Sequence, residues 1–390
     1  MAKSINVTIV GGGFGGVKTA LEIAADRSNQ VTLLSDRSDF QYYPALFSTA
    51  TGHSYRQSWV PLATIFKEYP NVTIINDSIS KIDTSAHLLK GKDSYHYETA
   101  ILALGSVTTY FGIQGIDTFS YGIKSQDEIR ALQKHLWNEM SDGRDSEKHY
   151  VIIGAGPTGV ELAGALGQYI RRMRKHFGIT KKRVTINLIE AAPRVLPRLS
   201  EASSKRALRR LRKLGVHVEL NKKVEQQTAS ELIVNGKPLA TQTVVWTSGV
   251  ANAPFYKDNP SQFSFNERGK VNVNEYLQAA PNVYVIGDNA NTPYAGLAQT
   301  ALHDAIFVAK HLGGSNAKYK AVLPPSVVPI GERWALFEWR WLKFGGRMGS
   351  IMRSLADMVG YHDILPIGWA FKFWRSQSKQ ELRIPDVFDK

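Results

Sequence analysis

Apolar residues near the start of the chain fall into short continuous runs that flank a helical stretch. Val7–Val10 is such a run and is typical of a buried parallel strand, and Val31–Leu34 repeats it. Between them, Val17–Ala25 has the apolar spacing of a helix. This order of strand, helix and strand predicts a βαβ unit at the start of the chain.

The same order returns in the middle of the chain. Tyr150–Ile153 predicts a strand, Val160–Leu166 begins a helix, and Val184–Ile189 predicts a second strand. A further apolar run within Pro281–Ala290 predicts one more buried strand, although the turn at Gly287, taken alone, is also typical of an ordinary strand end. Repeated units of this kind predict an α/β protein with parallel sheets.

A glycine cluster links the first strand to the helix in each unit. The spacing is G-x-G-x-x-G in both, with Gly11, Gly13 and Gly16 in the first copy and Gly154, Gly156 and Gly159 in the second. In such a loop the first glycine permits a tight turn, the second lets the backbone approach a pyrophosphate, and the third allows close packing of helix on strand. The helix N-terminus then favours the phosphate charge. One copy also fits a plain turn, whereas two copies in context predict two bound dinucleotides.

Polar residues end the second strand of each unit, where a dinucleotide presents its ribose. Ser35 and Asp36 follow the strand of the first unit, and Glu190 follows that of the second. A carboxylate there accepts hydrogen bonds from the ribose hydroxyls and repels a 2′-phosphate, so Glu190 predicts NADH rather than NADPH. Arg194 stands close by in sequence and weakens that preference.

Composition limits the chemistry that the side chains can carry. The 390 residues include no cysteine, which excludes disulfides, thiolate nucleophiles, cysteine-ligated zinc and iron–sulfur clusters, and no metal site is predicted. The 43% hydrophobic and 21% charged residues suit a globular protein of two or three domains. No apolar run approaches the roughly 20 residues of a spanning helix, and no signal peptide precedes the first strand, so we expect a cytoplasmic protein.

The formal net charge is +14, which favours an anionic partner. Two basic runs contribute: Arg171, Arg172, Arg174 and Lys175 with Lys181, Lys182 and Arg183, and then Lys205, Arg206, Arg209, Arg210, Arg212 and Lys213. Such runs are usually solvated helix faces. No aromatic platform interleaves them, so nucleic-acid binding is not expected, and attraction to anionic lipid is the preferred role.

From Gly331 onward the composition changes. Five of the eight tryptophans lie there, among arginine and lysine residues. Arg347–Tyr361 predicts an amphipathic helix. Its apolar face comprises Met348, Ile351, Met352, Leu355, Met358 and Val359, and its opposite face comprises Ser350, Arg353 and Asp357. Two interpretations stay open: the apolar face packs on the second domain or a sister subunit, or it lies in a membrane interface, which the aromatic and basic residues favour.

Eight stretches carry a family resemblance, in the family's order: VGGGFGGVKTA, YYPALFSTATG, AILALGS, IIGAGPTGVELAGAL, LIEAAPRVLP, VVWTSGV, VYVIGDNA and AGLAQTALHDA. Over nearly its whole length the chain resembles the two-dinucleotide-binding-domain flavoproteins, and most of all the type II NADH:quinone oxidoreductases, single-subunit NADH dehydrogenases that pump no protons. The resemblance implies tightly held FAD, NADH as substrate, and two-electron reduction of a membrane quinone to quinol. It also implies a homodimer and a peripheral enzyme on the cytoplasmic side of the cell membrane, with anionic lipid contacted by the C-terminal segment.

The resemblance further implies two Rossmann-like dinucleotide-binding domains, with the NADH domain inserted in the FAD domain. The expected ranges are 1–115 and 251–330 for the FAD-binding domain, 116–250 for the NADH-binding domain, and 331–390 for a C-terminal membrane-interface or dimerisation segment. The crossings fall near Gly105 and Gly249, where a missing side chain lets the backbone pass close to a cofactor. Leu104 replaces the threonine that is usual in the family, so a hydroxyl contact is absent there.

The family's motifs assign cofactor contacts to particular residues. For FAD these are Gly11, Gly13, Phe14, Gly15, Gly16, Ser35, Asp36, Ile79, Ala103, Gly105, Gly287, Asp288, Ala298 and Gln299. For NADH they are Gly154, Gly156, Pro157, Thr158, Gly159, Glu161, Glu190 and Gly249. Asp288 is expected to reach the ribityl and pyrophosphate part of FAD.

Three side chains are implied to serve the reaction itself. The family carries Ala-Gln-x-x-x-Gln on a helix beneath the isoalloxazine ring, with both glutamines lining the quinone site, and here these positions are Gln299 and His303. Their spacing puts both on one helix face. A histidine at this position keeps a hydrogen-bond donor for a quinone carbonyl and could also supply a proton. The alternative is a histidine bonded to Asp304 or to backbone.

Glu161 stands where the family has a glutamate between the nicotinamide and quinone sites, which the resemblance implies helps proton delivery or ring positioning. Burial near a flavin raises the pKa of a carboxyl group and suits such a role. The alternative is a glutamate that only caps the helix or pairs with a nearby basic residue.

The absence of cysteine excludes the disulfide reductases and the sulfide:quinone reductases of this superfamily, because their flavins exchange electrons with cysteine pairs. Two functions stay open beside quinone reduction. One is a soluble NADH-dependent reductase of a small redox protein. The other is an NADH-sensing flavoprotein that resembles apoptosis-inducing factor.

Overall fold

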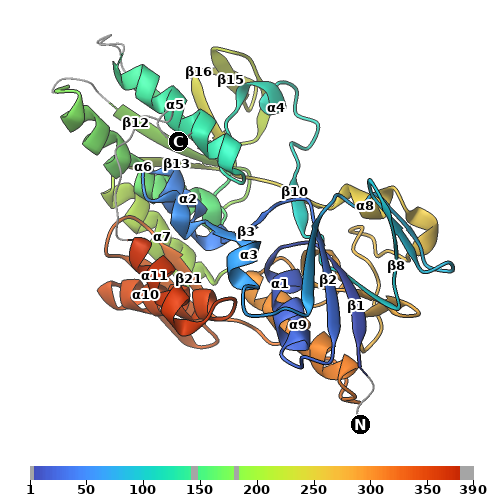
Figure 1. Cartoon of the computed structure of the whole chain (residues 1–390). Helices are drawn as coiled ribbons and strands as arrows, with labels where there is room; N and C mark the ends of the chain where they lie inside the picture. The colour runs from blue at the N-terminus through green and yellow to red at the C-terminus, as the bar shows by residue number, and fades with distance from the viewer. Residues whose placement is uncertain (1–3, 142–147, 180–183, 378–390) are drawn as a thin grey trace.

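Two β-sheets dominate the molecule, one mainly parallel with an antiparallel edge strand and one wholly parallel, and a small antiparallel sheet with two helices packs beside the second (Figure 1). The computed structural model describes residues 4–141, 148–179 and 184–377. Lys181–Arg183 of the first basic run and residues 378–390 of the C-terminal segment lie outside these ranges. The predicted α/β fold class is confirmed.

The first sheet has six strands in the order β19, β20, β9, β1, β2, β5. They are β1 (Asn6–Val10), β2 (Gln30–Ser35), β5 (Val72–Asn76), β9 (Thr99–Leu102), β19 (Gln278–Ala280) and β20 (Val283–Val285). β1 pairs in parallel with β2 and β9, and β20 pairs in parallel with β9, so the chain returns to this sheet late in its course. Helices α1 (Phe14–Ala24) and α9 (Ala298–Leu312) pack together on one face.

The second sheet has four parallel strands in the order β13, β12, β11, β17. They are β11 (Lys148–Ile153), β12 (Val184–Glu190), β13 (Val216–Leu220) and β17 (Thr243–Trp246). One face packs on α5 (Gln126–Ser141), α6 (Pro157–His176) and α7 (Glu201–Lys213). The other packs on the antiparallel strands β14 (Val224–Gln227), β15 (Glu231–Val234) and β16 (Lys237–Ala240). Tyr150 and Ile152 of β11 face the helices whereas Val151 and Ile153 face β14–β16, as strand alternation requires.

Two extended segments connect the halves of the molecule side by side. β10 (Ser106–Thr108) and β18 (Val250–Asn252) pair in antiparallel fashion, and they begin directly after Gly105 and Gly249. Each of these glycines has a positive φ, +66° and +71°. The sharp change of direction at each crossing therefore uses a conformation that glycine adopts without steric cost.

Short elements complete the first half. A hairpin-like sheet lies on its far face and comprises β6 (Lys81–Asp83), β7 (Leu88–Lys90) and β8 (Ser94–His96). The remaining short elements are β3 (Asp39–Gln41), η1 (Tyr43–Ala45), α2 (Leu46–Ala50), η2 (Tyr55–Gln57), β4 (Trp59–Pro61), α3 (Leu62–Ile65), α4 (Ile116–Phe119), α8 (Pro254–Lys257), η3 (Pro260–Gln262) and η4 (Gly287–Asn289). Although α2 is early in the sequence, it packs against α5 and α6 of the second half. This contact ties the two halves together.

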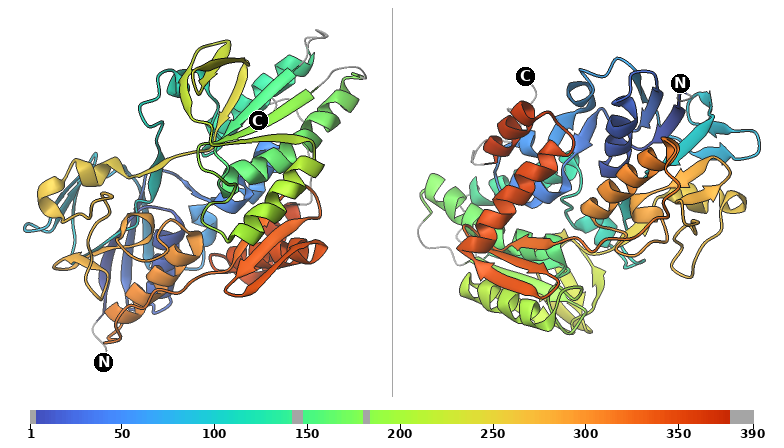
Figure 2. Two further views of the ribbon diagram at one scale, coloured as in Figure 1. Left: turned by 180° about the vertical axis from the view of Figure 1, so that it is seen from behind. Right: turned by 90° about the horizontal axis from the view of Figure 1, so that it is seen from below.

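The C-terminal module comprises β21 (Ser326–Pro329), β22 (Ala335–Trp339), β23 (Leu342–Gly346), α10 (Arg347–His362) and α11 (Ile367–Ser376). Its three strands form an antiparallel sheet that contacts α6 and α7, and α10 packs on that sheet. Figure 2 shows α10 and α11 at the outer surface of the molecule in the view from below. The predicted helix is confirmed, and it ends one residue later than expected.

Both helices after the glycine loops begin three residues earlier than the apolar spacing predicts. α1 begins at Phe14 rather than Val17, and α6 begins at Pro157 rather than Val160. The reason is that the loops themselves form the first helical turn, with Gly13 and Gly156 as N-caps. Proline at the first position of α6 costs no hydrogen bond, because the N–H that proline lacks would have no intrahelical partner there. The helix N-terminus therefore starts inside the glycine loop in both units.

Candidate functional site

The first glycine loop has the geometry that its spacing predicts. Gly11 has a φ of +115°, and a Cβ there would lie 2.3 Å from the Ala103 carbonyl oxygen. A Cβ on Gly16 would lie 1.9 Å from the Gly11 carbonyl oxygen. By contrast, a Cβ on Gly13 would meet no atom within 4 Å. The outer glycines are thus needed for packing, whereas the middle one borders open space.

The second glycine loop repeats this geometry. Gly154 has a φ of +102°, and a Cβ there would lie 2.0 Å from the Ser248 hydroxyl oxygen. A Cβ on Gly159 would lie 1.8 Å from the Gly154 carbonyl oxygen, and one on Gly156 would meet nothing within 4 Å. Each loop therefore leaves a free backbone cradle at a helix N-terminus, which fits the pyrophosphate of a dinucleotide. Pro157 and Thr158 lie in the first turn of α6 beside the second cradle.

The acidic residue at the end of β12 is held against the second loop. Glu190 Oε2 accepts a hydrogen bond from the Ala155 N–H at 2.6 Å, and Oε1 accepts one from Ala192 at 2.8 Å. Arg194 instead donates to the carbonyls of Leu199 and Pro197. The guanidinium is thus bonded to neutral carbonyls of its own loop and, within the described residues, forms no hydrogen bond or ion pair with Glu190, while its charge is kept, so its effect on the choice of nucleotide stays a prediction.

At the end of β2 the arrangement is different. Ser35 is buried, and its hydroxyl donates to the Arg37 carbonyl at 2.8 Å. The side chain of Asp36 is 60% exposed, with its carboxylate 3.9 Å from the Arg37 guanidinium. Of the two, only the Asp36 carboxylate is accessible to the hydroxyls of a ribose, while Ser35 supports the turn.

A second group of polar residues gathers where η4 meets β10. Asp288 Oδ2 accepts a hydrogen bond of 2.6 Å from the Ser106 hydroxyl, and the Asp288 carbonyl accepts one from Lys270. Gly287 has a φ of +71° and donates its N–H to Asp304 of α9 at 2.9 Å. Neither amide atom of the fully buried Asn289 side chain has a partner within the described part of the chain. These unpaired polar atoms beside the first glycine loop's sheet fit a polar cofactor.

The other residues that sequence motifs assign to FAD lie around the first sheet. Phe14, at the start of α1, packs edge to face on Phe40 with ring centroids 4.9 Å apart. A Cβ on Gly15 would touch Ile286 at 3.0 Å, and Ala103 follows β9 with 9% of its surface exposed. Ile79 is buried in the hydrophobic cluster on the far face of that sheet, so a contact of its backbone with FAD stays a prediction. A Cβ on Gly105 would meet no atom within 4 Å, whereas one on Gly249 would meet the Thr109 carbonyl at 2.5 Å.

Gln299 and His303 share one face of α9, as their spacing predicts. Ala298 begins this helix, and Gln299 in its first turn is exposed. His303 Nε2 lies 2.9 Å from the Lys320 carbonyl oxygen, which is the backbone-bonded alternative considered above. With that nitrogen engaged, a role for His303 toward a quinone stays a prediction.

Asp304 is a residue of this region that the motifs did not single out. It is fully buried, and its Oδ1 accepts a hydrogen bond of 2.6 Å from the Tyr319 hydroxyl while Oδ2 accepts the Gly287 N–H. Burial raises its pKa, and these two hydrogen bonds oppose the rise. Asp304 thus ties the N-terminal half of α9 to the turn that carries Asp288.

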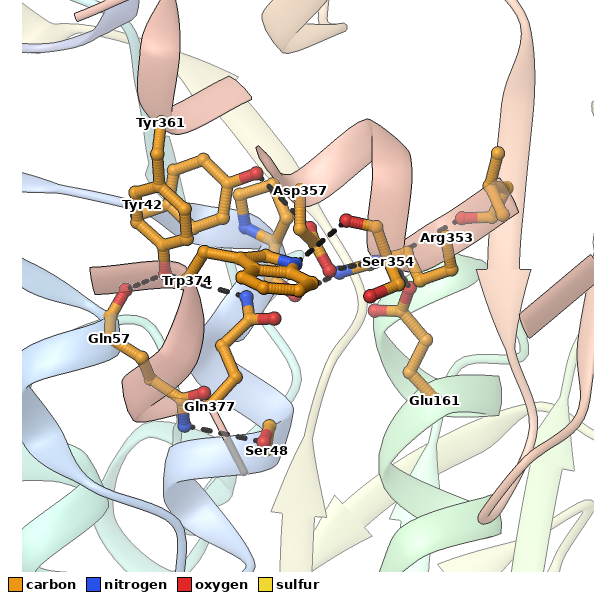
Figure 3. Close-up of polar contacts among 12 residues, drawn as sticks. Tyr42, Ser48, Gln57, Glu161, Arg353, Ser354, Asp357, Tyr361, Trp374 and Gln377 are labelled. Atoms are coloured by element: carbon orange, nitrogen blue, oxygen red, sulfur yellow. Dashed lines mark hydrogen bonds and ion pairs between the residues drawn. The ribbon is translucent and has the colours of Figure 1, made fainter. Parts of the chain in front are cut away.

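Glu161 lies in a buried polar network that joins three distant parts of the chain (Figure 3). Its side chain is 12% exposed, and its Oε1 lies 3.3 Å from Nη1 of Arg353 on α10. Nε of the same guanidinium donates to Asp357 Oδ2 at 2.8 Å, and Nη2 donates to the Pro44 carbonyl. Asp357 Oδ1 also accepts a hydrogen bond of 3.1 Å from the Tyr42 hydroxyl.

Burial dominates the electrostatics of this network. It raises the pKa of Glu161 to about 7, against the opposing effect of Arg353, and the nearby Asp357 charge adds to the rise. Burial also holds the pKa of Tyr42 well above its usual value. The arginine stays charged because the two carboxylates beside it raise its pKa, although burial acts in the opposite direction. Glu161 is therefore poised to gain or lose a proton near neutral pH.

The network continues through aromatic residues to the C-terminal helix. The Tyr42 ring stacks on Tyr361 with centroids 4.3 Å apart, and the Tyr361 hydroxyl donates to the Gln57 carbonyl at 2.5 Å. Trp374 of α11 donates its indole N–H to the Ser354 carbonyl at 2.9 Å. Tyr42 is therefore a core residue, whereas its neighbour Tyr43 is 45% exposed.

The sequence motifs did not single out Arg353, which pairs with Glu161, or Asp357, which pairs with Arg353. Arg353 and Asp357 were assigned only to the polar face of that helix. The sequence signal that could have identified them is an arginine and an aspartate spaced i, i+4 on a helix face with few other polar residues. Lys124 was missed as well: its Nζ donates to the Gly249 carbonyl at 3.2 Å beside the second crossing, and burial lowers its pKa.

A pocket of about 170 Å³ lies next to this network, between α2, α6 and the turn that joins β21 to β22. Ala165, Gln168 and Arg172 line it, and they occupy the same stripe of α6 as Glu161. Phe47 also lines the pocket, and its ring centroid lies 6.0 Å from the Arg353 guanidinium carbon. The pocket thus continues the face of α6 on which Glu161 sits.

Comparison with known proteins places the whole arrangement in a family. The family model for pyridine nucleotide-disulphide oxidoreductases matches residues 5–305. A type II NADH:quinone oxidoreductase of Mycobacterium tuberculosis is 30% identical, over 94% of this chain and 87% of the relative. One from Staphylococcus aureus is 24% identical, over 94% and 97% of the two chains.

Among solved structures, the NDH2 of Plasmodium falciparum in complex with NADH superimposes with a TM-score of 0.85 at 17% identity, over 96% of this chain and 98% of that one. The sulfide:quinone oxidoreductase of Aquifex aeolicus superimposes with a TM-score of 0.78 at 18% identity, over 96% and 92%. At these identities the likeness establishes the fold alone, while the family model and the mycobacterial relative establish the family. The chain belongs to the pyridine nucleotide-disulphide oxidoreductases and, among them, to the type II NADH:quinone oxidoreductases.

Proposed function

We propose that this protein oxidises NADH through bound FAD and reduces a quinone to quinol, without moving protons across a membrane. The observation that carries the proposal is the pair of glycine cradles, each open at a helix N-terminus and each followed by a carboxylate at the next strand end. Membership of the family supports it. The chain has no cysteine pair to accept electrons, which agrees with an external acceptor.

The first cradle and the residues around Asp288 are the proposed FAD site. When bound there, FAD accepts a hydride from NADH and passes two electrons to the quinone. Gly13 leaves room for the pyrophosphate, Asp36 receives the ribose, and Asp288 is kept in place by Ser106 and Lys270. The unpaired amide of Asn289 supplies further polar contacts.

The second cradle is the proposed NADH site, with Gly156 beside the pyrophosphate. Glu190 carries a negative charge at the ribose end and repels a 2′-phosphate, which favours NADH over NADPH. We further propose the domain division 1–115 with 251–330 for FAD and 116–250 for NADH. The two glycine crossings and the antiparallel pairing of β10 with β18 support that division.

Glu161 is the proposed proton donor to the quinone, and Gln299 a proposed hydrogen-bond donor at its head group. The pKa of Glu161, about 7, suits a group that loses and regains a proton in each turnover. Gln299 is exposed in the first turn of α9, near the turn that holds Asp288. His303 is proposed only as a secondary contact because its Nε2 is bonded to backbone.

The test is steady-state NADH oxidation with and without a soluble short-chain quinone, together with the visible spectrum of the purified protein. We expect an oxidised-flavin spectrum and turnover that depends on the quinone. A soluble redox-protein reductase would show a flavin spectrum but little quinone turnover. A protein of the NADH-sensing kind would reduce slowly and keep a long-lived charge-transfer band.

We also propose that the C-terminal module docks on an anionic membrane surface from the cytoplasmic side. The apolar stripe of α10, Met348, Ile351, Leu355 and Val359, is between 54% and 63% exposed, while the polar residues Arg353 and Asp357 face inward. On α11, Ile367 and Phe371 are exposed, and Lys372 lies 4.6 Å from the ring centroid of Trp369. Exposed apolar residues beside aromatic and basic ones fit the interface of a bilayer. No helix of the described residues is long and apolar enough to cross a membrane.

Vesicle co-sedimentation tests this proposal. The double variant Ile351→Glu with Leu355→Glu places two charges on the exposed stripe, and we expect binding to anionic vesicles to fall at least tenfold. The matched control is Ala131→Glu with Asn138→Glu, which adds the same two charges at exposed positions of α5, a helix well separated from α10 in Figure 1. If the stripe variant binds like the control but loses a dimer seen in the wild type, a sister subunit covers the stripe and the membrane proposal is wrong.

A further inference from the structure

Arg353 is shared between two carboxylates that belong to different parts of the fold. Its Nε donates to Asp357 on the same helix at 2.8 Å, and its Nη1 lies 3.3 Å from Glu161 on α6. All three side chains are at most 13% exposed. Figure 3 shows the guanidinium between the two acids. One positive charge thus serves two buried negative ones.

One cation beside two carboxyl groups favours a state in which one of the two carboxyl groups is protonated. If both acids ionise, the buried set carries a net charge of −1, which burial penalises, and protonating one acid removes that charge. The geometry decides which acid is protonated. Asp357 accepts the shorter hydrogen bond from Arg353 and a second one from the Tyr42 hydroxyl, whereas Glu161 has only the longer contact among the residues that the structure describes. The carboxylate form is therefore better supported at Asp357, and the proton resides on Glu161.

We propose that Asp357 is a positioning residue for proton delivery. It binds one edge of the Arg353 guanidinium, so less of that positive charge acts on Glu161. Glu161 can therefore carry a proton at neutral pH. This inference rests on the proposed role of Glu161 in quinone reduction. Asp357 itself touches neither substrate nor cofactor in the proposal.

The remaining anchors hold the guanidinium in its shared position. Nη2 donates to the Pro44 carbonyl and Nη1 to the Val327 carbonyl at 3.3 Å, so the guanidinium is fixed from two more sides. These neutral acceptors add no charge. Arg353 is thereby prevented from turning fully toward Glu161.

The other titratable groups of this region lie farther from Glu161 than Arg353 does. Tyr42 and Tyr361 stand on the far side of Asp357, and burial raises the pKa of both, so they stay neutral. His53, Arg172 and Glu332 line the pocket farther along α6, where Arg172 pairs with Glu332 at 3.4 Å. Arg353 and Asp357 are the charged groups that act directly on Glu161.

The reaction requires such a proton. NADH, one proton and quinone give NAD⁺ and quinol, so each turnover takes up one proton beyond the hydride. Glu161 in its protonated form supplies that proton to a quinone oxygen and is then reprotonated from water. Asp357 sets the pH range over which the protonated form is populated.

The direct test is an infrared pH titration of the holoenzyme, in which a protonated carboxyl group gives a separate carbonyl band. Glu161→Gln identifies the band by abolishing it. In the wild type we expect the band to disappear near pH 7. In Asp357→Asn the amide oxygen still accepts from Arg353 but the charge is gone, so we expect the midpoint to fall by about one pH unit, as loss of a like-charged neighbour implies. An unchanged midpoint overturns the inference.

Two further variants separate the effect of the Asp357 charge from a loss of stability. Asp357→Ser is a second neutral variant with the same expected shift, and Asp357→Glu keeps the charge and should restore the wild-type midpoint. A purely structural role for Asp357 would instead make all three variants lose stability without an ordered change in midpoint. That result would contradict the proposal.

The pH profile of turnover gives the functional readout. In the neutral variants the fall of kcat with rising pH should move to lower pH by the same amount as the infrared midpoint. Turnover with ferricyanide, which accepts electrons without protons, should keep its profile. A moved infrared midpoint with an unmoved quinone profile overturns the role in proton delivery. If the wild type shows no quinone turnover, the proposed function is wrong. The infrared titration needs no turnover, so it still tests the role of Asp357 when the proposed function fails.

Discussion

At the scale of single residues, Glu161 is a carboxyl group that is largely withdrawn from water. It is buried beside one shared cation, and its pKa of about 7 lies well above the ordinary value of a carboxyl group. Since the protonated form is the proposed donor, activity should be full below this pKa and decline as the pH rises through it.

Glu161→Gln removes the titrating proton while keeping a neutral side chain of the same shape. We expect kcat with a soluble quinone to fall about 10²-fold, the usual contribution of general acid catalysis, and the decline near pH 7 to vanish. Steady-state kinetics from pH 5.5 to 9 measure both. The flavin spectrum serves as the control and should not change, because FAD is assigned to the other glycine loop. An alkaline decline that persists unchanged in the variant would assign the titration to another group.

Glu190 is the residue on which the choice of nucleotide depends. Its carboxylate accepts two backbone N–H groups and presents its charge at the end of β12. We expect Glu190→Gln to weaken NADH about tenfold, the worth of one charge-assisted hydrogen bond, and to narrow the preference over NADPH. Michaelis constants for both nucleotides check this. An unchanged ratio of NADPH to NADH efficiency would contradict the assignment.

At the scale of elements, α10 exposes four of the six residues of its predicted apolar face, Met348, Ile351, Leu355 and Val359, whereas Met352 and Met358 are partly buried. Arg353 and Asp357 point into the molecule, whereas Ile351 and Leu355 are more than half exposed. A soluble helix usually has the opposite orientation. The buried ion pairs fix the rotation of α10 about its axis together with the close packing of Gly349 on Ala335 and of Gly360 on Tyr42.

Arg353→Met tests that role through stability. It leaves the Asp357 carboxylate buried without its cation, so we expect the free energy of unfolding to fall by about 3–5 kcal/mol. Adding Asp357→Leu removes the stranded charge and should recover part of the loss. Arg347→Met, at an exposed position of the same helix, is the control and should change stability by under about 0.5 kcal/mol. Urea unfolding measures all three. A single variant as stable as the control would rule out a structural role for the pair.

The amphipathic pattern of α10 was readable from sequence, but its orientation was not. Periodicity identifies which residues share a face, and a continuous helix from Arg347 was predicted on that basis. Which face turns inward depends on Glu161 and Pro44, which lie far away in the sequence. The same limit applies to Tyr42, whose partner Asp357 is equally distant in the chain.

At the scale of the whole molecule, two nucleotide cradles of the same design are joined by paired crossings. Gly13 and Gly156 occupy equivalent places, each with an extended backbone that any residue adopts and with open space where a Cβ would stand. Bulk at either position should therefore spare folding and block one nucleotide.

Gly13→Val should yield a folded protein that lacks FAD, and Gly156→Val a yellow protein that no longer binds NADH. Each variant is the control for the other. Circular dichroism checks folding, the flavin spectrum checks FAD, and equilibrium titration checks NADH. Loss of FAD in Gly156→Val with NADH binding intact would mean that the two cradles have been assigned the wrong way round.

Much of this architecture was accessible from local pattern alone. The strands and helices of the two βαβ units and the helix from Arg347 depend on neighbours within a few residues, so their spacing predicted them, with bounds that differ from the structure by up to three residues. The antiparallel sheets β6–β8, β14–β16 and β21–β23 were not predicted. The environment of His303 was not accessible, because the Lys320 carbonyl that engages it belongs to a loop without periodicity. The i, i+4 pair of Arg353 with Asp357 is visible in the sequence, but the ion pair of Arg353 with Glu161 was hidden, since an ion pair between distant segments leaves no mark on local sequence.

The central claim is that FAD held by the first cradle carries electrons from NADH in the second to a quinone. Anaerobic titration of the purified protein tests it most directly. The account predicts that one equivalent of NADH bleaches the flavin band and that one equivalent of a short-chain quinone restores it. A flavin that NADH reduces but quinone does not reoxidise, or a protein that holds no flavin, would contradict it.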